Sequence, residues 1–280
     1  MSKVIINLCI TGMVPTKDMT EFIPISSAEI IRTALACGRL GASIIHVHAR
    51  DTDGKPTWKK DVFAPIIEGI RNKNNNLIIN TTTSGRNWSD FERRADVLEL
   101  SGDLKPDMAS LTVGSMNFIK DPSMNSPEMI EQLATKMMER DIKPEFEVFE
   151  PGMVHKANYL LERGIVKDSH PYFNILLGSL GTSPLEPSVF AAFYAQLPKN
   201  AIWSVAGIGT YQLDANIMSL AYGGSVRVGL EDNIYYDRQK TLLASNEMLV
   251  ERIATIIRQM GLEVATAEEA RIMLGLKSRG

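Results

Sequence analysis

Short apolar runs alternate along the chain with longer segments in which apolar residues recur at helical spacing. The first run is 4–10, and in the segment after it Ile30, Ile31, Ala34 and Leu35 share one face. Runs of this length are typical of buried strands, whereas the helical spacing indicates an amphipathic helix. The pattern predicts strands at 4–10, 44–48, 77–80, 108–111, 146–149, 172–177, 202–206 and 225–228.

Helices are predicted between these strands, and several of them begin or end at residues that are typical of helix termini. Ser26 or Ser27 caps the first helix, Pro127 lies in the first turn of another, and Gly164 follows a third. A capping box at Thr266-Ala267-Glu268-Glu269 predicts a short helix after the last unit. The first helix has apolar positions up to Leu40, and the predicted helices after it cover 62–71, 90–100, 127–140, 154–163, 187–197, 211–222 and 241–260.

We count eight strand–helix units, with no strand doublet and no linker rich in proline, glycine or serine. Regular alternation of this kind predicts an α/β fold with a parallel sheet. Eight units favour a closed (β/α)8 TIM barrel over an open doubly wound sheet. We therefore expect residues 1–280 to form a single catalytic domain with a short C-terminal helical extension.

Composition narrows the class of protein. A hydrophobic fraction of 44% and a net charge of −3 describe an ordinary globular chain without the basic excess that a nucleic-acid surface needs, so we expect no nucleic-acid partner. No apolar run approaches membrane-spanning length, and we expect no membrane association. Cys9 and Cys37 form no disulfide framework and lie in apolar segments. The cysteine usage fits the cytoplasm.

The stretch 44–51 contains the most informative residues. His46 and His48 are two positions apart in a predicted strand, so their side chains project to the same face near its carboxyl end. Two adjacent imidazoles can share one metal ion, although two core histidines that only form hydrogen bonds would show the same spacing. In a barrel, Glu231 after the eighth strand would reach the same mouth and complete a two-histidine, one-carboxylate set. Zinc, iron, nickel and cobalt all accept this set, and we favour zinc.

Charged residues at other strand ends suggest a role for such a metal. A Lewis acid that polarises a ketone makes the adjacent carbon acidic enough for a carboxylate base. Asp232 beside Arg227 is a candidate base, and a structural ion pair at the barrel rim is the alternative. Glu147, flanked by apolar residues in the fifth strand, requires a partner in the site. Thr82 and Ser110 are substrate-binding candidates because their strands end at the mouth.

Taken together, these motifs resemble the β-keto acid cleavage enzymes. The likeness runs almost end to end and is carried by Ile10-Thr11-Gly12, 45–51 with 53–56, 144–150, 203–209 and 229–233. The resemblance implies a TIM barrel that assembles as a homotetramer, with zinc held by His46, His48 and Glu231. It also implies a Claisen-type exchange in which a β-keto acid and acetyl-CoA become acetoacetate and a new acyl-CoA. No phosphate-binding loop is apparent, so acetyl-CoA as cosubstrate comes from the resemblance.

The resemblance also implies roles for single residues. Asp232 and Arg227 would deprotonate the keto acid, while Thr82, Ser110 and Glu147 match site positions of the family. The aminohexanoate-cleaving members have a glutamate that pairs with the substrate amine, and here that position is Val14. We expect a β-keto acid without a cationic tail. Val14, Gly85 and Arg86 are further substrate-binding candidates. Gly85 and Arg86 follow the third strand, where Arg86 could bind a second carboxylate or could lie on the surface.

Three other classes of protein fit part of the pattern. A zinc barrel hydrolase would also place histidines at strand ends and would need no CoA. A class II aldolase would stabilise an enolate on zinc but would use an aldehyde partner. A non-catalytic scaffold with a structural metal is the remote alternative, because a closed structural site needs a fourth protein ligand and none is apparent.

Overall fold

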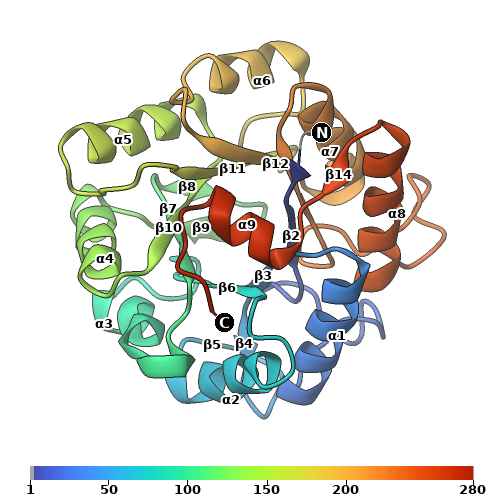
Figure 1. The fold of residues 1–280 in the computed structure, drawn as a ribbon, viewed down its shortest axis with the longest axis horizontal. Coiled ribbons are helices and arrows are strands. Elements are labelled where there is room, and N and C mark those ends of the chain that lie inside the picture. The colour runs from blue at the N-terminus through green and yellow to red at the C-terminus, as the bar shows by residue number, and fades with distance from the viewer. Residues whose placement is uncertain (1–2, 280) are drawn as a thin grey trace.

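The computed structural model describes residues 3–279, and in this part of the chain eight parallel strands close into a barrel (Figure 1). The strands pair in the order β10-β11-β12-β13-β2-β3-β6-β7. The predicted single-domain TIM barrel is confirmed. The barrel strands are β2 (Ile6–Cys9), β3 (Ile44–Val47), β6 (Ile78–Thr81), β7 (Met108–Thr112), β10 (Lys143–Val148), β11 (Tyr172–Leu177), β12 (Ile202–Gly207) and β13 (Ser225–Val228).

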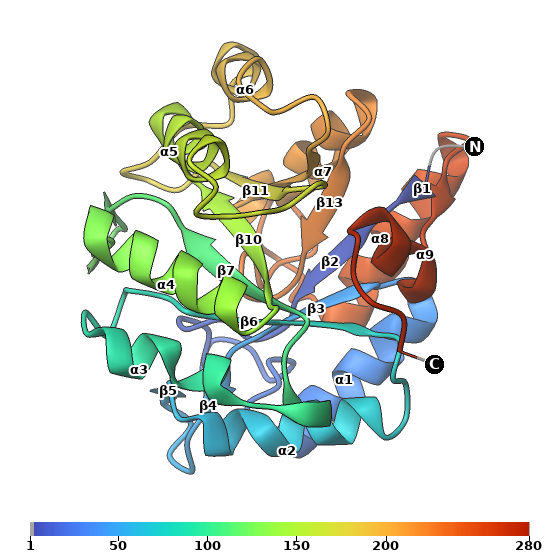
Figure 2. The same cartoon turned by 60° about the vertical axis from the view of Figure 1, so that its left-hand side comes forward.

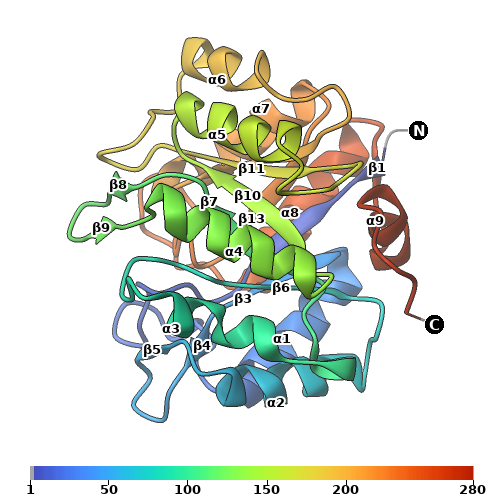
Figure 3. The same ribbon diagram turned by 90° about the vertical axis from the view of Figure 1, so that its left-hand side faces the viewer.

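Helices surround the barrel and cover its outer face (Figures 2 and 3). The first helix begins as predicted, because Ser26 accepts a hydrogen bond from the backbone of Glu29 and forms a capping box with it. None of the helices described within residues 3–279 is both long and apolar enough to cross a membrane. The helices are α1 (Ser27–Leu40), α2 (Lys60–Arg71), α3 (Phe91–Ala95), α4 (Pro127–Glu139), α5 (Pro151–Glu162), α6 (Pro187–Tyr194), α7 (Gln212–Ala221), α8 (Asn246–Gln259) and α9 (Ala267–Met273).

Three predicted helices were too long, and the one predicted over 187–197 ends at Tyr194. The prediction of a continuous helix over 90–100 was wrong, because α3 gives way to the 3-10 helix η1 (Asp96–Glu99). The helix predicted from residue 241 begins only at Asn246. The segment before it is a turn in which Asp237 accepts hydrogen bonds from the backbone of Thr241 and Leu242, and Ser245 then caps α8.

Two short hairpins lie in the loops after barrel strands. One joins β4 (Ala49–Arg50) to β5 (Pro56–Thr57), and the other joins β8 (Met116–Asn117) to β9 (Pro122–Ser123). Both follow strands whose carboxyl ends face the same side of the barrel. Both hairpins therefore lie on the mouth side of the barrel.

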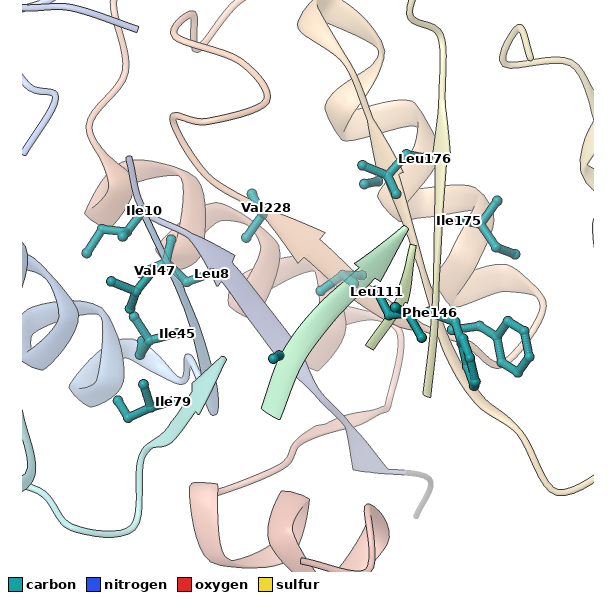
Figure 4. Packing of buried hydrophobic residues seen from close by; sticks show 14 of the residues in the cluster. Leu8, Ile10, Ile45, Val47, Ile79, Leu111, Phe146, Ile175, Leu176 and Val228 are labelled. Carbon is teal, nitrogen blue, oxygen red and sulfur yellow. The ribbon is translucent and has the colours of Figure 1, made fainter. Parts of the chain in front are cut away.

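Side chains that point outward from the strands form the main core with the helices (Figure 4). Leu8, Ile45, Ile79, Leu111 and Phe146 belong to this cluster and are fully buried. Burial of a side chain of this size contributes about 1.5–3 kcal/mol. Both cysteines, Cys9 and Cys37, are buried and unpaired, as predicted.

The amino-terminal end of the barrel has a second, smaller core. Helix α9 lies across the centre of the ring in Figure 1 and places Ala270 and Leu274 against Ile5, Ile44 and Ile78. The strands β1 (Lys3–Val4) and β14 (Glu263–Val264) pair in parallel next to it. The short C-terminal helix therefore closes one end of the barrel.

The inward-facing residues change from apolar to polar along the barrel axis. Two residues beyond the apolar Ile5, Ile44 and Ile78 come Asn7, His46 and Asn80, which are also inward-facing and buried. The barrel interior thus runs from an apolar end at α9, through a polar layer, to the open mouth at the carboxyl ends.

Candidate functional site

A cavity of about 550 Å³ opens at the carboxyl ends of the strands. Most residues selected from the sequence line it. They are Val14, His48, Thr82, Arg86, Glu147, Arg227, Glu231 and Asp232.

His46, His48 and Glu231 converge at the bottom of this cavity, where His48 and Glu231 line it. The two Nε2 atoms of His46 and His48 are 3.1 Å apart, and Nε2 of His48 lies 3.3 Å from Oε1 of Glu231. Nε2 of His46 lies 3.8 Å from Oε2 of Glu231. Burial holds the pKa of His46 well below its usual value, so this imidazole is neutral and has a free lone pair.

This donor set fits a metal ion. Oε2 of Glu231 is buried and accepts no hydrogen bond within residues 3–279, although a carboxylate oxygen in that position requires a partner. Two imidazoles and one carboxylate leave an open coordination position, as a catalytic ion needs. His46, His48 and Glu231 therefore form a candidate metal site.

A glycine brings Glu231 to this position. Gly12 has φ +68°, a left-handed conformation, and a Cβ atom built on it would lie 2.5 Å from Cγ of Glu231. Arg50 fixes the same loop, because its buried guanidinium donates to the carbonyls of Gly12 (2.7 Å) and Pro15 (3.0 Å). The loop after β2 thus supports the ligand after β13.

Arg227 connects three carboxylates beside the metal site. It is 1% exposed, and its guanidinium donates to Asp232 (2.9 and 3.2 Å), Glu147 (3.1 Å) and Glu231 (3.0 Å). Burial acts against its charge, but Asp232 and the two glutamates raise the pKa of Arg227 well above the usual value. The guanidinium is permanently charged and holds all three acids in fixed orientations.

The neighbouring carboxylates of Glu231 and Asp232 differ in basicity. Burial would raise the pKa of Glu231, but the neighbouring His48 imidazole and the Arg227 guanidinium hold it well below the usual range. Burial raises the pKa of Asp232, although Arg227 opposes the shift. Glu231 therefore stays ionised as a ligand, while Asp232 is the better proton acceptor. Glu147 accepts a further hydrogen bond from Thr112 (2.8 Å).

The predicted substrate-binding residues do not all reach the cavity. Val14 is 55% exposed on its wall, and Thr82 lines it while accepting from the backbone of Ser84. Ser110 does not line the cavity, because its hydroxyl oxygen accepts from the backbone N–H of Thr83. Gly85 packs instead against the backbone of Met124, where a Cβ atom would lie 2.4 Å from the carbonyl oxygen.

Arg86 lies in the cavity wall. Its guanidinium carbon is 3.7 Å from the ring centroid of Phe118, a residue of the β8–β9 loop. Glu231, Asp121 and Glu147 act on the Arg86 charge only from beyond ion-pair distance, so Arg86 has no ion-pair partner among residues 3–279. The site thus contains a stacked cation that is available to an anionic ligand.

Several residues of this region were missed in the sequence. Glu145, Asn7, Asn80 and Asn174 form a buried polar cluster beneath the cavity and beside His46, and burial together with Glu147 raises the pKa of Glu145 to about 7. The signal was present, because Glu145 and Glu147 are two residues apart in one strand and therefore share the inward face.

A second cavity, of about 600 Å³, lies at the opposite end of the barrel beside the segment that follows α9. Its charged side chains pair with one another, as in Lys143 with Asp168, Lys277 with Asp141 and Arg279 with Asp107. The mouth is therefore the better candidate for chemistry.

A TIM barrel that brings two imidazoles, three carboxylates and a buried guanidinium to its mouth has the form of an enzyme active site. A family model described as "beta-keto acid cleavage enzyme" matches residues 3–276. The chain belongs to the β-keto acid cleavage enzyme family and is an enzyme of that kind.

Curated relatives span essentially the whole chain. A 3-keto-5-aminohexanoate cleavage enzyme of Fusobacterium nucleatum is 37% identical over 279 residues, which is 99% of both chains. A 3-oxoadipate:acetyl-CoA acetyltransferase of Cupriavidus necator is 36% identical over 278 residues, covering 98% of this chain and 95% of the relative.

Solved structures support the fold. The ternary complex of ObcA with C4-CoA adduct and oxalate superposes with a TM-score of 0.80 at 18% identity, covering 91% of this chain and 68% of that one. An N-acetylneuraminate lyase from Mycoplasma synoviae gives a TM-score of 0.54 at 12% identity, with 97% and 78% covered. At these identities the likeness concerns the barrel alone.

Proposed function

We propose that this enzyme exchanges acyl groups between a β-keto acid and acetyl-CoA, giving acetoacetate and a new acyl-CoA. The observation that carries the proposal is Asp232, a buried carboxylate of raised basicity that Arg227 holds beside the candidate metal site. Two relatives named as acetyl-CoA transferases, for 3-oxoadipate and for 3,5-dioxohexanoate, support acetyl-CoA as the cosubstrate.

We assign zinc to His46, His48 and Glu231. The two-nitrogen, one-oxygen donor set suits it, whereas magnesium would prefer oxygen ligands. When bound, zinc supplies a positive charge that stabilises the enolate of the β-keto acid.

Asp232 starts the reaction by accepting a proton from the carbon between the two carbonyls. That carbon then forms a bond to the thioester carbonyl of acetyl-CoA, and the CoA thiolate leaves. The thiolate next attacks the original ketone, the adjacent carbon–carbon bond breaks, and Asp232 returns its proton to the departing acetoacetate carbon. Arg227 keeps Asp232 oriented throughout, and Glu147 holds the other side of the guanidinium.

The cavity wall favours a tail that is not cationic. Val14 offers no charge to an ammonium group, while Arg86 offers a cation without a carboxylate partner in residues 3–279. Burying an ammonium group without a counter-charge is costly. We therefore propose a β-keto acid with a second carboxylate in its tail, and the 36% identity to an enzyme named for 3-oxoadipate is consistent with this.

The test incubates zinc-loaded protein with acetyl-CoA and β-keto acids that carry apolar, anionic or ammonium tails. Acetoacetate and the new acyl-CoA, measured by mass spectrometry, should rise together, fastest for the anionic tail, and Asp232→Asn should abolish both. Arg86→Gln should lower kcat/KM for the anionic tail about 10–100-fold and leave the apolar tail nearly unchanged. Keto acid consumption without acetyl-CoA would indicate a hydrolase or an aldolase instead.

A further inference from the structure

Glu145 is a fully buried carboxylate without a lysine or arginine partner among residues 3–279. It is 0% exposed, and the described residues that donate hydrogen bonds to its oxygens are three amides: Asn7 (2.7 Å), Asn174 (3.3 Å) and Asn80 (2.6 Å). Removing a carboxylate from water costs several kcal/mol unless something compensates. The exchange reaction proposed above gives Glu145 no role, since it lies beneath the cavity rather than in its wall.

The three asparagines come from three different strands. Asn7 is on β2, Asn80 on β6 and Asn174 on β11, while Glu145 is on β10. Ser204 and Tyr172 extend the network behind Asn174, with contacts of 2.9 and 3.0 Å. Amide donors from opposite sides of the barrel thus fix the position of this one carboxylate.

The imidazole of His46 lies beside Glu145. Nδ1 of His46 lies 3.6 Å from Oε2 of Glu145, which is slightly beyond hydrogen-bond distance. Nδ1 is buried and has no hydrogen-bond partner within the described chain. Nε2 on the opposite edge of the ring faces His48 and Glu231. The imidazole therefore lies between the metal ligands and Glu145.

We propose that Glu145 is a positioning residue for the metal ligand His46. Its carboxylate accepts a hydrogen bond from Nδ1–H of His46, which leaves the lone pair on Nε2 free for the ion. A small movement of the ring on metal binding closes the 3.6 Å gap to a hydrogen bond. Partners of this kind fix the tautomer and orientation of metal-bound histidines, and their loss typically lowers metal affinity 10–100-fold. The inference rests on the metal site of the proposed function.

The experiment compares zinc affinity among variants of the full-length protein by competition with a chromophoric chelator. Glu145→Gln keeps the shape of the side chain but removes its charge, and we expect zinc to bind 10–100-fold more weakly. Ser204→Ala is the matched control, because Ser204 is equally buried in the same network but does not contact His46. Its zinc affinity should stay within about twofold of the wild type.

Two further measurements separate positioning from a structural role. Without zinc, Glu145→Gln should melt at or above the wild-type temperature, since it removes a buried charge, whereas with zinc it should melt lower. The ring ¹⁵N shifts of His46 should report the Nδ1–H tautomer in the wild type and a mixture in the variant. If Glu145→Gln does not fold, Asn80→Ser removes the donor to the oxygen nearest His46 and should weaken zinc several-fold.

Unchanged zinc affinity in Glu145→Gln would overturn the positioning role. Two ions per chain in the wild type would also overturn it, because His46, Glu145 and Glu147 are close enough to form a second site. If His46→Ala also binds zinc normally, the metal site itself is wrong, which is a separate failure.

Discussion

Arg227 allows the sharpest test of how the site is held together. Its guanidinium contacts carboxylates on two separate parts of the chain, with Glu147 in β10 and with Glu231 and Asp232 after β13. A lysine at this position has its donors on one atom, so it cannot reach both parts at once. Arg227→Lys therefore leaves at least one buried carboxylate without its cation. Breaking a buried charged network costs about 3–5 kcal/mol, and the retained ammonium offsets part of this, so we expect a loss of about 3 kcal/mol.

The assay is urea unfolding of the metal-free protein, so that metal binding does not contribute to the free energy of unfolding. The control is Arg238→Lys, because Arg238 pairs with Asp214 but is 70% exposed, and an exposed pair contributes about 0–1 kcal/mol. In the exchange assay Arg227→Lys should lower kcat/KM at least about 100-fold, because Asp232 loses its orientation. If the unfolding free energies of Arg227→Lys and Arg238→Lys differ by less than about 0.5 kcal/mol, Arg227 does not hold the site in the way described.

Three further predictions concern the barrel end, acid stability and substrate choice. Leu274→Ala should lower the free energy of unfolding by about 2–4 kcal/mol in urea titrations, because Leu274 is 1% exposed and packs in the core at the amino-terminal end of the barrel. The control is Ile272→Ala, at a position that is 73% exposed, which should change the free energy of unfolding by less than about 0.5 kcal/mol. Burial would raise the pKa of Glu29, but Lys17 and the backbone of the capping box lower it to about 2. The ionised Glu29 side chain therefore stabilises the fold fully above its unfolded pKa near 4.5, and this contribution is lost as the pH falls towards 2. Glu29→Gln should cost about 1–2 kcal/mol at pH 7 and little at pH 2, and equal losses at both would refute the shift. Val14→Glu should lower kcat/KM for an anionic tail and raise it for an ammonium tail, and an unchanged ratio would show that this wall does not contact the tail.

The architecture could be predicted from the sequence because it depends on local periodicity. Strand and helix alternation, the inward pair His46 and His48, and the return of Glu231 to the same mouth all follow from spacing and from the geometry of a parallel barrel. The structure brings Arg227, Asp232 and Glu147 together with them.

What could not be predicted depends on contacts between distant strands. The role of Glu145 becomes apparent only from its contacts with Asn7, Asn80 and Asn174, and in the sequence each asparagine alone is an ordinary polar residue. Ser110 was expected at the mouth because its strand ends there, yet its hydroxyl lies against the Thr83 backbone. It is two residues before Thr112, which lines the cavity. Depth along a barrel strand is set by the stagger between neighbouring strands, and that stagger is not encoded in local spacing.

The parallel pairing of β1 with β14 and the position of α9 have a consequence for how the chain folds. In the smaller core at the amino-terminal end of the barrel, Ile5 near the start of the sequence packs together with Leu274 near its end. This part of the core therefore cannot form until almost the whole chain has been synthesised. Contacts of such high sequence separation are slow to form, because the entropy of closing the loop is lost before the contact stabilises the fold. During translation, a nascent chain would therefore expose the apolar amino-terminal ends of β2, β3 and β6 to water. Packing of α9 against them would be the step that buries them.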